Sequence, residues 1–274
     1  MAFKVRGGVW YMSQMKAIVQ KRGVITASTG NHAQSIAYAG LLFEIPVTVV
    51  MPKGSPSLKI ESTEDFGAKV VLHGSYFEEA REYAEALARK KKLQFVHGIN
   101  EPILYEGVGS MHLEVIQELP DVDIVVNPIG GGSGAASACI VYKTLNPRIQ
   151  VIGVQAEGAP ALYQSWKRGS IVSTEGVKTK AEGLATSTAY ELPLKILRQN
   201  LDDITVVSDD ELSEGVRTIF LATRQVAELS GAASTAAAMR MKGLMRGKKV
   251  VLMLTGGNID PEKFGEIINR SKLR

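Results

Sequence analysis

Eight short apolar runs, with segments of a different character between them, constrain the fold of this chain more than any other feature. They are rich in β-branched residues and lie at 24–26, 47–51, 69–72, 93–96, 123–127, 150–155, 204–207 and 249–254. Continuous apolar character is typical of strands that are covered on both faces. Two intervening segments, 75–92 and 209–240, carry the apolar spacing of helices. This alternation predicts an α/β fold with mainly parallel sheets, in one sheet or two.

The composition excludes several classes of protein. The chain has 274 residues, of which 45% are hydrophobic and 22% charged, so it is not a disordered chain. The net charge is only +4 and the lysine run 90–92 follows a helix-like segment, so we expect no nucleic-acid partner. A single cysteine, Cys139, excludes an internal disulfide and a multi-cysteine metal site, and we expect no metal. Since no membrane-spanning run or signal-peptide pattern is present, we expect a soluble, cytoplasmic protein without a membrane partner.

Three of the predicted strands end in small, glycine-containing turns. They lie at 27–32 after the first strand, 130–134 after the fifth and 255–258 after the eighth. In parallel α/β folds, ligands bind beyond the carboxyl ends of the strands. The three turns are therefore the candidate functional positions.

The second turn, Gly130-Gly131-Gly132-Ser133-Gly134, leads into a predicted helix. Successive glycines let backbone N–H groups converge, and a helix N-terminus adds positive potential, so the turn favours a phosphate. A tight turn that packs a helix on a sheet is the structural alternative. A dinucleotide fingerprint is incomplete because Ser137 replaces its last glycine, and no Gly-Lys-Ser/Thr follows for a nucleoside-triphosphate loop.

The first turn places hydroxyl, amide and imidazole groups where a strand gives way to the predicted helix 33–42. Hydroxyls and N–H groups at such a point suit a carboxylate ligand. The alternative is a plain helix cap, supplied by Ser28 or Asn31. His32 alone is expected to be structural, because nothing close to it in the sequence would orient it as a base.

Read together with the N-terminus, the three turns resemble the fold-type II pyridoxal-phosphate enzymes. The opening segment 3–7 resembles the segment whose lysine carries the cofactor, and 28–34 resembles the substrate-carboxylate loop. The Asn-His-Ala-Gln sequence in that loop is nearest the threonine/serine dehydratase and serine racemase branch. The segment 130–134 resembles the phosphate loop, and 255–258 the segment that meets the pyridine nitrogen. The resemblance covers essentially the whole chain.

This resemblance implies a role for each candidate residue, with pyridoxal 5'-phosphate as the cofactor. Lys4 would be the Schiff-base lysine and would later move the substrate's α-proton. Phe3 would pack near the pyridine ring, Asn31 would hydrogen-bond the phenolic oxygen, and Thr255 would contact the ring nitrogen. The implied phosphate ligands are Gly130, Gly131, Gly132 and Ser133. The implied substrate ligands are Ser28, Thr29, Gly30, Asn31 and His32.

The resemblance also implies two lobes, each with a mainly parallel sheet flanked by helices, as in the tryptophan synthase β fold. The small lobe would comprise 8–107, and the large lobe 1–7 and 108–274. The implied reaction is dehydration and deamination of L-threonine or L-serine to a 2-oxo acid and ammonia. The implied partners are a small amino-acid substrate and further copies of the chain, in a homodimer or homotetramer.

Three alternatives remain open, two of them because the chain departs from the family pattern. Lys4 is nearly terminal, whereas family members carry a further segment before it, so we expect that segment to be missing here. An inactive, N-terminally truncated paralogue is therefore one alternative. Thr29 stands where racemases favour serine, yet a serine racemase remains a second alternative. A threonine synthase-like β-replacement enzyme is a third, although the Asn31-His32 pair argues against it.

Overall fold

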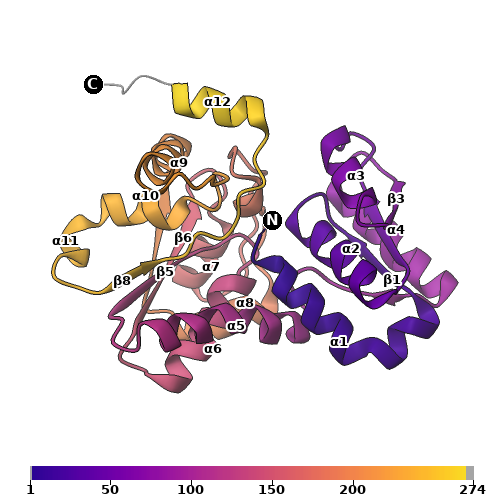
Figure 1. Ribbon diagram of the computed structural model, residues 1–274, viewed down its shortest axis with the longest axis horizontal. Coiled ribbons are helices and arrows are strands. Elements are labelled where there is room, and N and C mark those ends of the chain that lie inside the picture. The colour runs from indigo at the N-terminus through magenta and orange to yellow at the C-terminus, as the bar shows by residue number, and fades with distance from the viewer. Residues whose placement is uncertain (1, 270–274) are drawn as a thin grey trace. The chain divides into compact units, whose positions relative to one another are not determined.

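The computed structural model describes residues 2–269, which form two compact units. The smaller unit is Phe3–Val108, and the larger one comprises Ala2 and the residues from Gly109 onward. Each unit contains one four-stranded parallel sheet (Figure 1). Helix α5 (Pro102–Glu118) contains the boundary between the units. Residues 3–7 belong to the smaller unit, whereas the family resemblance assigns 1–7 to the larger lobe.

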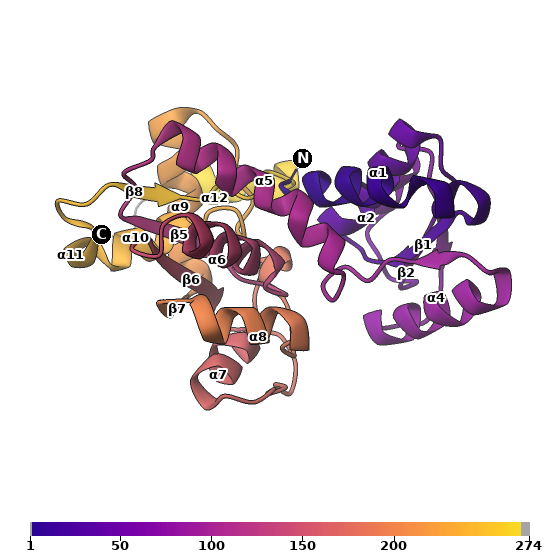
Figure 2. The same cartoon turned by 90° about the horizontal axis from the view of Figure 1, so that it is seen from below.

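The sheet of the smaller unit has the strand order β3-β2-β1-β4. Its strands are β1 (Val24–Ala27), β2 (Val47–Met51), β3 (Lys69–Leu72) and β4 (Gln94–Phe95). Its helices are α1 (Lys4–Arg22), α2 (Asn31–Phe43), α3 (Ser57–Glu64) and α4 (Phe77–Lys91). Figure 2 shows α4 on one side of this sheet and α1 and α2 on the other. Three alanines of α4, spaced four residues apart, pack on Ile25 and Val50, so burial of this narrow stripe fixes α4 on the sheet.

Glycines bring α1 close to α2. A Cβ atom at Gly8 would lie 2.7 Å from the carbonyl oxygen of Ser35, and the Ser35 side chain is also in its way. A Cβ atom at Gly7 would lie 2.9 Å from the carbonyl oxygen of Leu104. At these two positions, α1 therefore packs against neighbouring backbone and leaves no room for a side chain.

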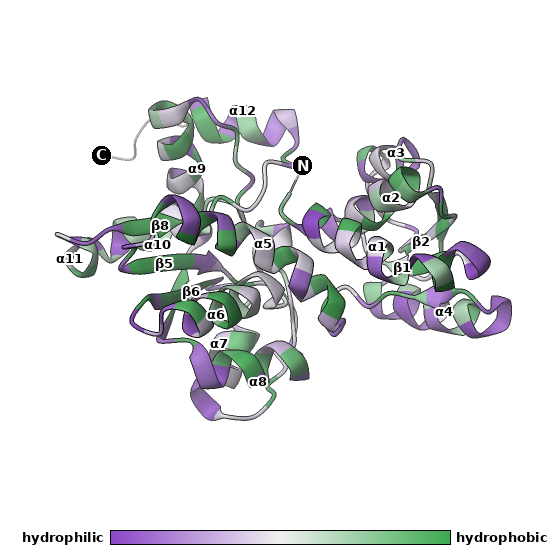
Figure 3. Cartoon of the chain, turned by 60° about the horizontal axis from the view of Figure 1, so that its bottom comes forward, coloured by the Kyte–Doolittle hydropathy of each residue, from purple (hydrophilic) through white to green (hydrophobic). Residues whose placement is uncertain are grey.

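The sheet of the larger unit has the strand order β7-β6-β5-β8. Its strands are β5 (Ile124–Pro128), β6 (Gln150–Ala156), β7 (Asp203–Val207) and β8 (Val250–Leu252). Its helices are α6 (Ser133–Leu145), α7 (Ala161–Arg168), α8 (Glu191–Asn200), α9 (Asp209–Thr223), α10 (Ala233–Arg240), α11 (Lys242–Met245) and α12 (Pro261–Asn269), with a 3-10 turn at Glu182–Leu184. The apolar strands, green in Figure 3, supply one side of a core that α9 and α10 complete with Leu212, Val216 and Ala233.

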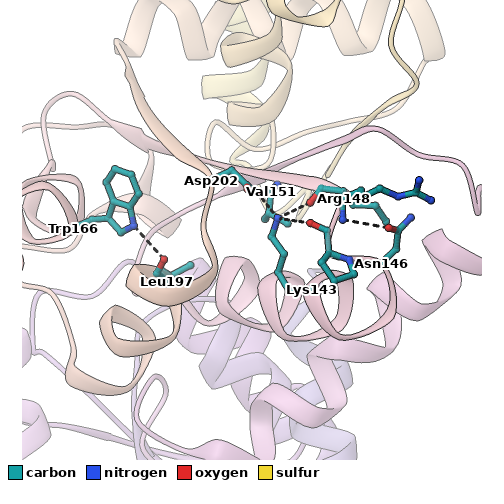
Figure 4. Close-up of polar contacts among 9 residues, drawn as sticks. Lys143, Asn146, Arg148, Val151, Trp166, Leu197 and Asp202 are labelled. Atoms are coloured by element: carbon teal, nitrogen blue, oxygen red, sulfur yellow. Dashed lines mark hydrogen bonds and ion pairs between the residues drawn. The ribbon is translucent and has the colours of Figure 1, made fainter.

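An ion pair fixes the C-terminal end of α6. Lys143 Nζ lies 2.6 Å from Asp202 Oδ2 and also donates to the carbonyl oxygen of Ile149, at 2.7 Å (Figure 4). The same carboxylate oxygen accepts from the backbone N–H of Val151, at 2.6 Å. Lys143 is mostly buried, and its partners Ile149 and Asp202 directly precede β6 and β7, so this cluster fixes α6 relative to the sheet. The other end of α6 carries the glycine-rich turn.

The structure confirms all eight predicted strands, with small shifts at their ends. The helical spacing over 209–240 belongs to two helices, because α9 ends at Thr223 and α10 begins at Ala233. Arg224 adopts a left-handed conformation, with φ of 61°, and the following turn packs Gly231 closely against Gly256. The chain leaves the helical conformation there, and the backbone of Gly231 contacts that of Gly256. Apolar periodicity does not reveal a contact between segments so far apart in the sequence. Among the helices within residues 2–269, none is both long and apolar enough to cross a membrane.

We expect Gly8→Ala to lower the free energy of unfolding by about 1–3 kcal/mol, as for other side chains forced into packed interiors. Alanine is the better helix former by about 1 kcal/mol, so a loss reports the contact with α2. The control is Gly265→Ala in α12, where a new Cβ meets no atom within 4 Å. Urea denaturation of both variants measures the difference. Equal stability of the two variants would contradict close packing of α1 on α2.

Candidate functional site

Lys4 is the first residue of α1, and its backbone is held in place. The Ser35 hydroxyl of α2 donates to the carbonyl oxygen of Lys4, at 2.6 Å. The Lys4 amine lies 3.5 Å from the carbonyl oxygen of Gly98 and 5.5 Å from the centre of the Phe3 ring. Phe3 thus lies beside the Lys4 side chain, and Gly98 supplies the acceptor that the amine faces.

The surroundings of Lys4 disfavour its charge. Burial lowers the pKa of Lys4 from 10.5 to about 8. The N-terminus of α1 acts in the same direction, because a helix N-terminus carries positive potential and the first turn of α1 contains no acidic residue. A large fraction of neutral amine near pH 8 makes Lys4 a competent nucleophile and proton acceptor.

The turn from Ala27 to Asn31 leads into α2, and its N-cap residue is Gly30, which has no side chain that could cap the helix. Instead, the Ser28 hydroxyl accepts from the N–H of Gly30, at 3.3 Å, within the turn itself. Ser28, Thr29, Gly30 and Asn31 are all half-buried. This half-exposed helix N-terminus suits a small anion.

His32 is buried, and a residue on β1 orients it. Its Nε2 lies 3.0 Å from Thr26 Oγ1, and Thr26 Oγ1 in turn donates to the carbonyl oxygen of Val96, at 2.8 Å. Burial is the main cause that lowers the pKa of His32 to about 3, followed by the charge of Lys4. Sequence reasoning found no partner for His32. Thr26 is that partner, and a buried hydroxyl on a strand otherwise apolar was the available signal.

The glycine-rich turn of the larger unit is tightly packed. Gly132 adopts φ of 96°, which favours glycine, and a Cβ atom there would lie 2.8 Å from Pro193. A Cβ atom at Gly130 would collide with the carbonyl group of Gly183. Gly132 is also the N-cap of α6 and provides no side chain to cap the helix. The first N–H groups of any α-helix lack intrahelical acceptors, and Gly132 does not satisfy those of α6 through a side chain. Gly130 and Gly131 are half-buried, whereas Gly132 and Ser133 are buried, and the turn has the features of a phosphate cradle.

The third turn lies against the segment 228–232. The carbonyl oxygen of Gly256 accepts from the N–H of Glu228, at 3.0 Å, and Gly256 pairs with Ala2 in an isolated antiparallel bridge. Gly183 packs against the Ser230 side chain, where a Cβ atom would lie 2.6 Å from Oγ. Contacts from Gly130 to Gly183, Ser230 and onward to Gly256 thus join the second and third turns. Thr255, next to Gly256, is largely buried.

Asn127, at the end of β5, is a site candidate that sequence reasoning missed. Its side chain is 1% exposed, and within residues 2–269 neither its Oδ1 nor its Nδ2 has a hydrogen-bond partner. A buried amide of this kind raises the free energy of the fold unless water or a ligand satisfies it. Asn127 lies three residues before Gly130. The sequence signal for this residue was an amide side chain at the end of an otherwise apolar strand, close to the glycine-rich turn.

Comparison with known proteins identifies the family. A family model described as pyridoxal-phosphate dependent enzyme matches residues 1–256. The chain belongs to this family. The L-threonine ammonia-lyase of Thermotoga maritima is 37% identical over 273 residues, which cover 100% of this chain and 68% of that protein. A processed threonine deaminase isoform 2 from Solanum lycopersicum has 31% identity and a TM-score of 0.92, covering 97% of this chain and 74% of its own. Maize serine racemase has 26% identity and a TM-score of 0.91, covering 97% of this chain and 82% of its own.

The pyridoxal-phosphate enzyme is of fold type II, with the tryptophan synthase β-like architecture, in the threonine dehydratase and serine racemase branch. The cofactor of the family is pyridoxal 5'-phosphate. The described residues fit this group. An amine of lowered pKa is present at Lys4, and an uncapped helix N-terminus follows the glycine turn. The Gly130 and Gly132 positions tolerate no side chain, which keeps that turn narrow.

We expect Lys4→Met to raise the free energy of unfolding at pH 7 by about 2 kcal/mol in the cofactor-free protein. Below pH 8 the folded and unfolded chains both carry a protonated Lys4, and burial penalises the folded one. Since the unfolded chain binds more protons between pH 8 and 10.5, the penalty disappears over that range. The advantage of Lys4→Met should therefore shrink as the pH rises.

Urea denaturation at several pH values measures this difference. The control is Lys21→Met, at the exposed end of α1, which should change the stability by less than about 0.5 kcal/mol. A Lys4→Met variant that is less stable than the parent at every pH would show that Lys4 is not held against a burial penalty.

Proposed function

We propose that this enzyme dehydrates and deaminates L-threonine or L-serine to the 2-oxo acid and ammonia. The lowered pKa of the buried Lys4 amine is the observation that carries the proposal, because the reaction needs a group that both gains and loses a proton near neutrality. The family membership supports it, as does the name of the Thermotoga maritima relative, L-threonine ammonia-lyase.

In this proposal the larger unit binds the cofactor through its turns. The N–H groups of Gly130, Gly131, Gly132 and Ser133 hold the phosphate, and Thr255 donates or accepts a hydrogen bond at the pyridine nitrogen. A threonine hydroxyl cannot stabilise a positive charge there as a carboxylate would. When bound, pyridoxal phosphate supplies an electron sink for the charge left on the substrate's α-carbon. A weak sink suits prompt loss of the β-hydroxyl group.

The smaller unit, in the same proposal, binds the substrate and moves the proton. The half-buried Ser28, Thr29, Gly30 and Asn31 hold the substrate carboxylate at the N-terminus of α2, and Asn31 also donates to the cofactor's phenolic oxygen. His32 supports this turn from within and stays neutral, since its pKa lies near 3. Phe3 lies beside the Lys4 side chain. Lys4 Nζ accepts the α-proton.

A 2-oxo acid assay tests the proposal. The purified chain, supplied with pyridoxal phosphate, should release 2-oxobutanoate from L-threonine or pyruvate from L-serine. Lys4→Ala should lower the rate by roughly 10²–10⁴-fold or more, because no other group replaces the proton acceptor. Lys21→Ala, at the exposed end of α1, is the matched control and should keep the parent's rate.

Serine racemisation is the second candidate, and the likeness to maize serine racemase favours it. Thr29 carries the hydroxyl that a proton donor on the opposite face of the substrate would need. Chiral chromatography of the L-serine reaction separates the two reactions. D-Serine without pyruvate would replace the lyase proposal with racemisation. Neither D-serine nor 2-oxo acid from the cofactor-loaded parent would contradict both.

A further inference from the structure

The hydrogen bonds around Thr26 determine which nitrogen of His32 carries the proton. Thr26 Oγ1 has one hydrogen, and it donates that hydrogen to the carbonyl oxygen of Val96, at 2.8 Å, which can only accept. The same oxygen therefore accepts from His32 Nε2, at 3.0 Å. His32 is thus fixed with its proton on Nε2 and a lone pair on Nδ1.

The ring of His32 also packs against the segment that faces Lys4. A Cβ atom at Gly98 would lie 3.0 Å from His32 Cδ2 and 3.2 Å from Cγ, so only glycine lets the backbone approach the ring this closely. The carbonyl oxygen of this same Gly98 is the acceptor for Lys4 Nζ. Two residues upstream, Val96 is held by Thr26 through its carbonyl group and by Ile25 through its N–H, at 2.9 Å.

We infer that Thr26 and His32 are positioning residues for Lys4: they hold the segment 96–98 so that the Gly98 carbonyl directs the Lys4 amine. A carbonyl acceptor that holds one N–H of a neutral amine sets the direction of the nitrogen lone pair. That lone pair is the group that takes a proton from the substrate in the proposed function, on which this inference rests. This positioning role differs from the expected role of His32 as a substrate ligand. It acts through Thr26 on β1 and through Val96, which directly follows β4.

The electrostatic surroundings of His32 agree with a neutral ring. Burial disfavours protonation of the ring, Lys4 and His97 act in the same direction, and the carbonyl group of Val96 opposes them. His97 itself lies near Arg81 and Glu85, whose charges act on it in opposite directions. A protonated His32 would place a second positive charge beside the Lys4 amine, so its fixed neutral form matters for Lys4.

Thr26→Val removes the hydroxyl and keeps the shape, and Thr26→Ser restores the hydroxyl. The control is Thr63→Val in α3, where an equally buried hydroxyl donates only to Lys59 of its own helix, at 2.8 Å. Two readouts on the cofactor-free full chain need no enzymatic activity. One is ¹⁵N–¹H NMR of the histidine rings, with His112 as internal reference. The other is the pH dependence of acetic anhydride labelling at Lys4, followed by mass spectrometry.

In the parent and in Thr26→Ser, His32 should give the signals of a ring protonated on Nε2. In Thr26→Val these signals should move while those of His112 stay. The pH dependence of Lys4 labelling should also shift by about half a pKa unit or more, which changes labelling at pH 7 about threefold. The shift is expected because the Gly98 carbonyl group no longer holds the amine in its place. Thr63→Val should match the parent in both readouts.

Unchanged Lys4 labelling in a folded Thr26→Val would overturn the inference. If that variant does not fold, Gly98→Ala serves instead, because its methyl group displaces the His32 ring, and unchanged labelling there would overturn the inference equally. A shift in Lys4 labelling together with no 2-oxo acid from the loaded parent would uphold the positioning role and contradict only the lyase proposal.

Discussion

Burial of the Lys4 amine at the N-terminus of α1 is the constraint on which the arrangement of the smaller unit depends. Burial removes water from the amine at that point, so its pKa falls to about 8. Close packing keeps it there, since Gly8 seats α1 on α2 and Ser35 binds the Lys4 carbonyl group. Reactivity at Lys4 therefore comes with a loss of stability that the surrounding packing has to offset.

In the larger unit, loops pack directly against one another through their backbones, with glycines at the points of contact. Gly130, Gly183, Gly231 and Gly256 each lie where a Cβ atom would strike a neighbouring turn. These contacts join the glycine turn after β5 to the turn after β8, and Ala2 pairs with Gly256 beside them.

The sequence predicted the eight strands and the three turns because each depends on local chemistry, such as β-branched runs and glycine clusters. The break between α9 and α10 could not be predicted, since it depends on Gly231 meeting Gly256, 25 positions later. The same holds for Thr26 and Gly98. The hydroxyl of Thr26 stands out in its strand, but its partners, His32 and Val96, lie in other segments that the fold brings near it. The site roles assigned by family resemblance stay predictions.

Covalent labelling tests most directly the prediction that Lys4 is the lysine that carries the cofactor. Borohydride treatment of the chain with bound pyridoxal phosphate fixes the cofactor to the amine that holds it, and peptide mass spectrometry then locates it. The account predicts the added pyridoxyl phosphate on Lys4, with the other lysines unmodified. The label on a different lysine, or no label on a chain that retains the cofactor, would contradict it.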